Sequence, residues 1–305
     1  MTVPSHEMRR RGIGDFVDRH FKVLSLAPAA IFLLLLTVYP IVNLVLMASS
    51  TIRFENAQEI WTWSLGANFQ RLLSDELFRV SLKNTVLFAI ASVAIEMVLG
   101  LALAILVSSA TRLKGIVRTL LIVPILMPPV AIGSMWKLMY SYDFGVLNQI
   151  VTGLGFYPIN WTGSPDLALW SIVLVDIWHW TPFVFLILFA AVEGLPREVI
   201  EAARIDGATN RDLIFKIIIP LLMPAIVVAL LFRTILAFKV FDQVFLLTSG
   251  GPGTATEMVS LHLYKVFFQS NELGYGAMLS LAIICATVAF LWVARRASSA
   301  LERKN

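Results

Sequence analysis

Several ionisable side chains lie inside long apolar stretches of the sequence. A charged group is costly in such a setting, so it usually has a partner or a role in a pathway. Asp176, His179, Trp180 and Phe183 recur at spacings of three and four, which would place them on one face of a helix. An acid, an imidazole and two aromatic rings offer hydrogen bonds to hydroxyl groups and apolar surfaces to sugar rings. This face is a candidate binding site; the alternative is a polar seam between helices.

The other ionisable groups in apolar stretches are Glu96, Lys137, Arg233 and Lys239. If these stretches cross a membrane in alternating directions, Asp176 and Arg233 lie at similar depths and can be neighbours. Such a pair would either fix the bundle or belong to the pathway, and the sequence leaves both open. We expect Glu96 to be structural, because its neighbours are apolar or small, and Lys137 to extend towards a membrane surface.

The stretches that carry these residues are long enough to cross a membrane. Of the 305 residues, 58% are hydrophobic and 14% are charged, against about 25% charged in an ordinary soluble domain. The apolar residues fall into runs of about 20, the length that a helix needs to cross roughly 30 Å of hydrocarbon. The six runs cover residues 24–48, 84–108, 117–140, 167–192, 217–239 and 277–294.

The sequence therefore predicts an all-α membrane protein, a bundle of six transmembrane helices, because unpaired backbone amides exclude open sheets from lipid. We expect an N-terminal tail at 1–23, a membrane domain at 24–294 and a C-terminal tail at 295–305. Prolines within the runs predict kinks and not breaks. These are Pro40, Pro124, Pro128, Pro129, Pro182, Pro220 and Pro224.

Lysine and arginine are distributed unevenly between the two sides of such a bundle. The tails and two alternate loops carry sixteen of them, whereas the other three loops carry six when Lys239 at their boundary is counted. Because cytoplasmic loops are the basic ones, both termini are expected in the cytoplasm and the loops at 48–83, 141–166 and 240–276 outside. The net charge of +4 follows from the same rule, so we expect no nucleic acid partner.

Motifs for catalysis or for a bound cofactor do not occur in the sequence. It contains neither G-x-x-x-x-G-K-[ST] nor G-x-S-x-G, and its four histidines are scattered. The single cysteine, Cys285, excludes an internal disulfide and a cysteine metal site. We expect no enzymatic activity, no metal and no cofactor of its own.

One basic loop, at 194–216, is long enough to fold as a separate hairpin of two short helices. Pro196 suits the first turn of a helix, and Gly207 permits a tight turn. Thr209 and Asp212 have the spacing of a capping box at the start of the second helix. That helix would run directly into the span that begins with Pro220.

This loop resembles a known family. Glu201-Ala202-Ala203, three residues, Gly207, nine residues, Ile217, one residue and Ile219-Pro220 are similar to the EAA motif of ABC importer permeases, EAA-x3-G-x9-I-x-LP, with one change from Leu to Ile219. The stretch from Leu195 to Ala208 looks like the carbohydrate-uptake branch. So does the later sequence from Phe241-Asp242 to Leu247-Thr248-Ser249-Gly250-Gly251-Pro252, which is similar to the maltose and glycerol-phosphate type of first permease subunit.

The resemblance implies a permease subunit in the inner membrane of a bacterium or archaeon, forming half of a pathway for a sugar or sugar-like solute. The implied partners are a second permease, two ATP-binding subunits that hold the ATP, and an extracytoplasmic solute-binding protein. It also implies that the loop couples to the ATPase and that Phe238 and Lys239 line the substrate pathway with the face at Asp176. The implied coupling residues are Glu201, Ala202, Ala203, Asp206 and Gly207.

Two other classes of membrane protein compete with this interpretation. A secondary transporter would also carry ionisable groups inside the membrane, but it needs no protruding loop and usually shows repeated halves, which this sequence lacks. A membrane enzyme would need a cluster of acids, bases or metal ligands, and none is apparent.

Overall fold

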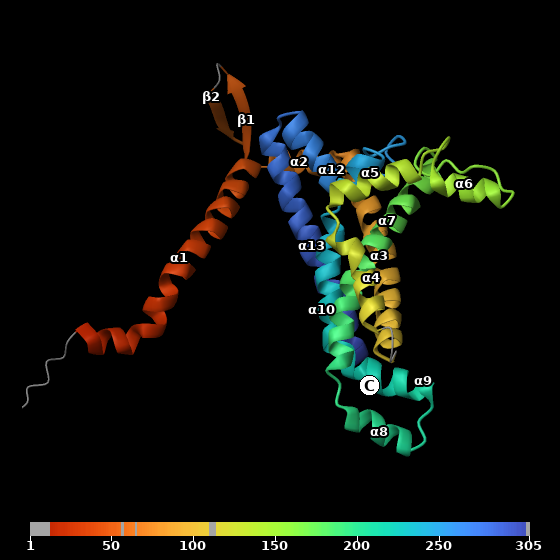
Figure 1. Ribbon diagram of the computed structural model, residues 1–305. Coiled ribbons are helices and arrows are strands. Elements are labelled where there is room, and N and C mark those ends of the chain that lie inside the picture. Colours follow the sequence, from red (N-terminus) through yellow and green to blue (C-terminus); the bar gives the residue numbers. More distant parts are fainter. Residues whose placement is uncertain (1–12, 56–57, 65, 110–113, 303–305) are drawn as a thin grey trace, which may run out of the picture.

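The computed structural model describes residues 13–55, 58–64, 66–109 and 114–302. The regular secondary structure of this part of the chain is helical except for one short β-hairpin (Figure 1). The elements are α1 (Ile13–Ala48), β1 (Ser50–Glu55), β2 (Gln58–Trp63), α2 (Ala67–Ser74), α3 (Glu76–Ser109), α4 (Lys114–Leu126), α5 (Pro129–Met139), α6 (Val146–Gly153), α7 (Pro165–Glu193), α8 (Arg197–Ile205), α9 (Asn210–Asp212), the π-helical turn η1 (Leu213–Ile218), α10 (Ile219–Phe238), α11 (Asp242–Leu247), α12 (Val259–Tyr264), the π-helical turn η2 (Lys265–Gln269) and α13 (Leu273–Glu302).

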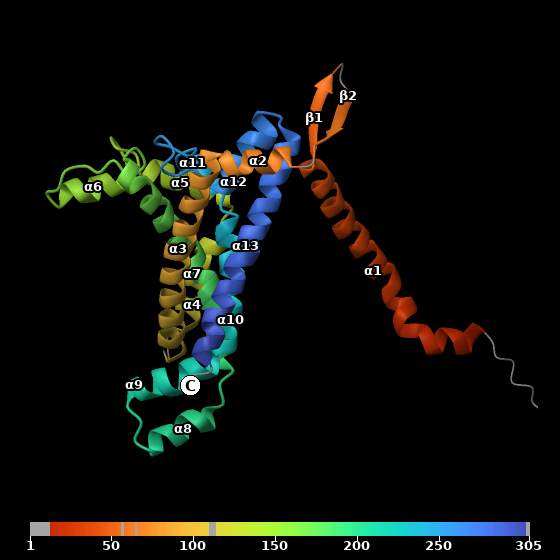
Figure 2. The same ribbon diagram turned by 180° about the vertical axis from the view of Figure 1, so that it is seen from behind.

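Five helical stretches in the described chain are long and apolar enough to cross a membrane. They are α1, α3, α7, α13 and the continuous stretch from α9 through η1 to α10. Figures 1 and 2 show α3, α4, α7, α10 and α13 side by side, while α1 diverges from them. We call the end of the bundle that carries β1 and β2 the hairpin end, and the end that carries α8 and α9 the loop end.

The predicted single helix at 117–140 is wrong. Instead, α4 and α5 meet at an angle of 95° across Met127 and Pro128. A proline disfavours helical backbone in the residue before it, and Pro128, which precedes Pro129, has φ −59° and ψ 136°. Pro129 then begins α5, where its missing N–H costs nothing. The tandem prolines therefore break this crossing, whereas Pro40, Pro124, Pro182 and Pro224 lie inside continuous helices.

The helices at both ends of the chain extend into the segments predicted as tails. Helix α1 begins at Ile13, eleven residues before the predicted span, and α13 continues to Glu302. Neither segment contains a proline or a capping signal that would stop a helix at the edge of the apolar run. The helices therefore extend past the apolar residues. The first 12 and last three residues of the predicted tails lie outside the described chain.

The centre of the bundle is the contact between α3 and α7. A methyl group at Gly100 of α3 would lie 2.6 Å from Cγ1 of Val184 on α7, so only glycine allows this approach. Lipid tails are as apolar as leucine, so helices in a membrane associate through close packing and buried polar contacts. Helix α1 is different, because most residues in the part that could span a membrane, Ser25–Ala48, are exposed, and only Ala48 at its end is buried.

The hairpin end is held together by Asp75, at the start of α3. Its carboxylate accepts hydrogen bonds from the Tyr275 hydroxyl, from the Phe78 amide (2.9 Å) and from Nε2 of His262 (3.1 Å). Burial acts to raise the pKa of Asp75, but these hydrogen bonds, with that of Tyr275 the largest, leave the pKa below its ordinary value. The carboxylate of Asp75 thus connects the start of α3 to α12, through His262, and to α13, through Tyr275.

The loop end has the local structure that the sequence predicts. Thr209 accepts a hydrogen bond from the Asp212 amide (3.2 Å), and Asp212 accepts one from the Thr209 amide (3.3 Å), which makes a capping box. Gly207 has φ +85°, a conformation that favours glycine, and it turns the chain between α8 and α9. The second helix then continues through η1 into α10, as expected.

Candidate functional site

Three ionisable residues from three helices meet inside the bundle. Arg233 on α10 donates from Nε to Oε2 of Glu96 on α3 and from Nη2 to Oε1 of the same carboxylate at 2.9 Å. The same Nη2 donates to Oδ2 of Asp176 on α7. All three side chains are at most 2% exposed. We call these residues the ion triad.

The ion triad compensates charges that could not be buried singly. A buried ion loses several kcal/mol of hydration, which only close opposite charges and further hydrogen bonds can offset. A guanidinium presents its donors in a fixed fork, so it can bind two carboxylates from different directions. The ring of Trp180 also lies against it, with its centroid 5.2 Å from Cζ of Arg233. The alternating directions of the spans predicted that Asp176 and Arg233 can be neighbours. The structure also brings Glu96 into contact with Arg233.

A small cavity of about 130 Å³ adjoins the ion triad. Asp176 belongs to both, because its side chain contacts Arg233 and also lines the cavity. The walls come from the bend before α5, from α7 and from the chain between α10 and α11. The lining residues are Pro129, Asp176, His179, Trp180, Leu236, Lys239, Val240, Phe241, Asp242 and Gln243.

Four of the six residues that were predicted for a substrate pathway line this cavity: Asp176, His179, Trp180 and Lys239. Phe183 does not line it, but its ring packs edge-on against Trp180, with 5.9 Å between the centroids. Phe238 differs from expectation, because it is 1% exposed and its ring packs against Phe290. At the last position of α10 it lies in the hydrophobic core, whereas Leu236 and Lys239 on either side of it line the cavity.

Sequence analysis missed Asp242 and Gln243, the polar residues that the short helix α11 brings to the cavity. Nε2 of Gln243 lies 3.1 Å from Nδ1 of His179, which fixes both side chains. Oε1 of Gln243 is buried without a partner in the described chain. It can therefore accept a hydrogen bond from a hydroxyl group in the cavity. One signal in the sequence could have indicated a polar site here. Three of the four residues from Lys239 to Asp242, directly after an apolar span, are polar or aromatic.

The coupling residues implied by the EAA motif lie on α8 and on the turn after it. Glu201, Ala202, Asp206 and Gly207 are exposed. Ala203 differs, since it is 9% exposed and packs in a cluster with Leu213, Ile218 and Leu222 of its own chain. Of the five residues, Ala203 is therefore the one that packs within its own chain. Its small side chain lets α8 lie close to η1 and α10.

Comparisons with known proteins point in one direction. Residues 96–304 match the family model of the binding-protein-dependent transport system inner membrane component. The trehalose/maltose transport system permease protein MalF of Thermococcus litoralis is 37% identical over 75% of this chain and 78% of its own length. The sulfoquinovosyl glycerol transport system permease protein SmoG of Agrobacterium fabrum is 34% identical over 92% of both chains. A crystal structure of a bacterial ABC transporter that imports the acidic polysaccharide alginate has the same fold, with a TM-score of 0.80, 20% identity and coverage of 94% of this chain and 98% of that one.

The first prediction concerns the ion triad. Arg233→Met should destabilise the protein by about 3–5 kcal/mol, because it leaves two carboxylates buried without a counter-ion. The triple variant Glu96→Gln, Asp176→Asn, Arg233→Met should recover most of that loss, since it buries no charge. Thermal unfolding of the purified protein in detergent measures both. A triple variant no more stable than Arg233→Met alone would show that lost packing, and not unpaired charge, is the cause.

Proposed function

The chain belongs to the family of binding-protein-dependent transport system inner membrane components, and from this premise we propose that it is the permease subunit of an ABC importer for a sugar or sugar-like solute. In this role it forms half of the translocation pathway and couples to an ATPase subunit through the 194–216 loop. The chain itself is a transport component and no enzyme.

The observation that carries this proposal is the loop end. The hairpin of α8 and α9 projects beyond the bundle (Figure 1). It presents the acid Glu201 and the large apolar side chain of Ile205, which is 86% exposed. An exposed isoleucine beside exposed acids and a small residue suits a protein partner. Since η1 joins this hairpin to α10 without a break, movement of the hairpin would be transmitted to the helix that carries Arg233.

The cavity beside the ion triad supports a polyhydroxylated solute. Gln243, Asp242 and Lys239 offer hydrogen-bond acceptors and donors, and Trp180 offers a ring on which a sugar can stack. Its volume of about 130 Å³ is too small for a sugar with its hydration shell, as expected for half of a site. The names of two relatives, trehalose/maltose and sulfoquinovosyl glycerol permeases, point to the same class of solute.

The partners we propose are a second permease of a different sequence, two ATP-binding subunits that bind the ATP, and an extracytoplasmic solute-binding protein. The protein spans the inner membrane of a bacterial or archaeal cell, with both termini in the cytoplasm. Support comes from a structural neighbour, a bacterial alginate ABC transporter in complex with an alginate pentasaccharide-bound periplasmic protein, which has a TM-score of 0.81 at 19% identity. It also comes from the basic residues, which gather in the loop end and the tails.

The second prediction tests the substrate pathway. Trp180→Ala and Lys239→Met should each reduce uptake of the transported sugar at least ten-fold, because they remove the ring and the ammonium group of the cavity. ATPase stimulation by the loaded binding protein should remain. Lys137→Met, which removes an exposed cation outside the cavity, is the matched control. Unchanged uptake in both cavity variants would rule out this cavity as part of the pathway.

The third prediction tests coupling through the loop. Glu201→Ala removes a charge that we expect to pair across the ATPase interface, a change that commonly costs 2 to 5 kcal/mol of binding. Gly207→Val strains a backbone with φ +85° and should displace α8 from α9. Both variants should insert into the membrane at normal levels and lose ATPase association or uptake. Wild-type uptake in both at equal expression would contradict the coupling role.

The fourth prediction concerns orientation. Single cysteines at Ser164 and at Thr209, in a Cys285→Ser background, lie at opposite ends of the bundle. A membrane-impermeant thiol reagent should label only the cysteine at 164 in intact cells, and both after lysis. Labelling at 209 in intact cells would reverse the orientation and place the loop on the wrong side for an ATPase.

A further inference from the structure

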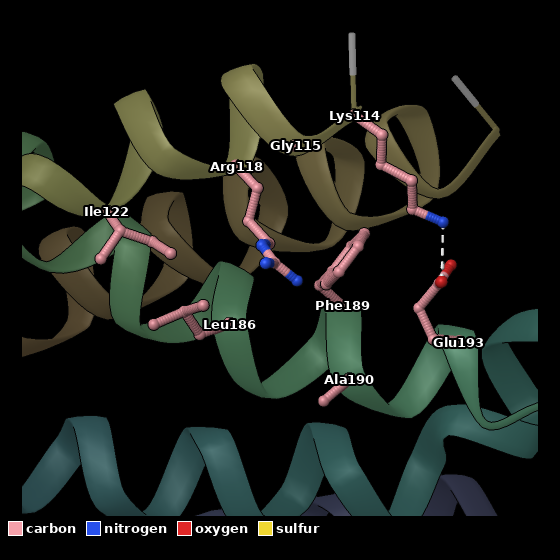
Figure 3. Close-up of a pocket in the computed structure, with 8 residues that line it drawn as sticks. All are labelled: Lys114, Gly115, Arg118, Ile122, Leu186, Phe189, Ala190 and Glu193. Atoms are coloured by element: carbon pink, nitrogen blue, oxygen red, sulfur yellow. Dashed lines mark hydrogen bonds and ion pairs between the residues drawn. The ribbon is translucent and has the colours of Figure 1, made fainter. Parts of the chain in front are cut away.

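A second pocket lies at the loop end, far from the cavity and unused by the proposed transport mechanism. It is a groove of about 670 Å³ between the start of α4 and the end of α7. Figure 3 shows the side chains of Lys114 and Arg118 reaching from α4 towards α7, with the ring of Phe189 between their charged groups. The lining residues are Lys114, Gly115, Arg118, Ile122, Leu186, Phe189, Ala190 and Glu193.

The groove has a charged mouth and an apolar floor. Lys114 Nζ donates to Oε2 of Glu193 at 2.6 Å and lies 5.4 Å from the centroid of the Phe189 ring. The Phe189 ring lies beside these charges, and Ile122 and Leu186 continue the groove along the two helices, away from Lys114 and Glu193. One end of the groove therefore suits an ionic group and the other suits a hydrocarbon chain.

The charges at the mouth favour an anion. Glu193 is the only acid among the described residues that line the groove. It accepts a hydrogen bond from Lys114, which uses one of the three ammonium protons. Among the described residues, no acid other than Glu193 is paired with Lys114, and none is paired with the guanidinium of Arg118. A neighbouring pocket shares Lys114 and Glu193 and adds Arg197 and Arg204 from the loop. The two pockets together are lined by four cations and one carboxylate.

We propose that this groove binds an anionic phospholipid, with its phosphate at the mouth that Lys114 and Arg118 line and an acyl chain along Ile122 and Leu186. Basic pockets between membrane helices at the cytoplasmic side bind anionic head groups, and each lysine or arginine near the surface adds about a five-fold preference. Arginine binds phosphate oxygens through two parallel donors, which adds geometric fit to the charge.

The position of the site connects the lipid to the coupling loop. Glu193 is the last residue of α7, and α8 begins at Arg197 after a short turn. A phosphate on Lys114 would compete with Glu193 for its ammonium group or bridge to Arg197. The lipid would thereby tie the base of the coupling hairpin to the inner leaflet, the leaflet that the proposed orientation assigns to the loop end.

Photolabelling of the complete importer tests this site. The complex is reconstituted with a phosphatidylglycerol probe that carries a photoreactive group on its acyl chain, and labelled peptides are identified by mass spectrometry. We expect labelling at 114–122 and 186–193, at least five-fold above that of a phosphatidylcholine probe. Lys114→Gln with Arg118→Gln should abolish this difference, while Lys114→Arg with Arg118→Lys and the control Lys137→Gln should preserve it.

Two results would overturn the proposal. Equal labelling by both probes would mean that the groove holds lipid without regard to charge. Absent labelling in the groove would mean that another subunit, most simply the second permease, covers it. Neither result depends on sugar uptake, which is measured separately on the same preparation, so the lipid site and the transport function can fail independently.

Discussion

The contact of Arg233 with Glu96 and Asp176 is the constraint on which the rest of the bundle depends. Arg233 lies 137 residues from Glu96 and 57 from Asp176 in the sequence, and the three come from α3, α7 and α10. Three buried charges fix the rotation of each helix, because a small rotation would separate a charge from its partner. The contact is possible only because α3 and α7 approach closely at Gly100 and Val184.

This constraint also determines where a cavity can form. One turn after Asp176, which binds Arg233, the same face of α7 carries His179 and Trp180; all three line the cavity, and the Trp180 ring also packs against Arg233. The helix that holds Arg233 begins in the loop end, at Asn210. From Asn210 to Arg233 a helix rises about 35 Å. A single continuous element therefore joins the exposed hairpin to the ion triad, which is the mechanical basis of the coupling that we propose.

The sequence predicted what depends on local chemistry and missed what depends on packing. The capping box at Thr209, the turn at Gly207 and five of the six spans follow from residue types and spacing. The break at Pro128 differs from the predicted kink because single prolines are tolerated in membrane helices, whereas two in succession break the helix here. The burial of Ala203 could not be read from the motif, because a small side chain suits a contact with its own chain as well as with a partner.

The contribution of Gln243 was beyond sequence analysis for a different reason. Helix α10 ends at Phe238, and the chain turns through Lys239 and Val240 before α11 begins. In lipid, backbone outside a helix is tolerated only where protein or a cavity satisfies its polar groups. Here the irregular segment folds back over α7, and it places Gln243 on His179. The end of α10 is therefore the position at which a polar cavity is compatible with the membrane. Residues just beyond an apolar run can line such a cavity as well as residues inside the run.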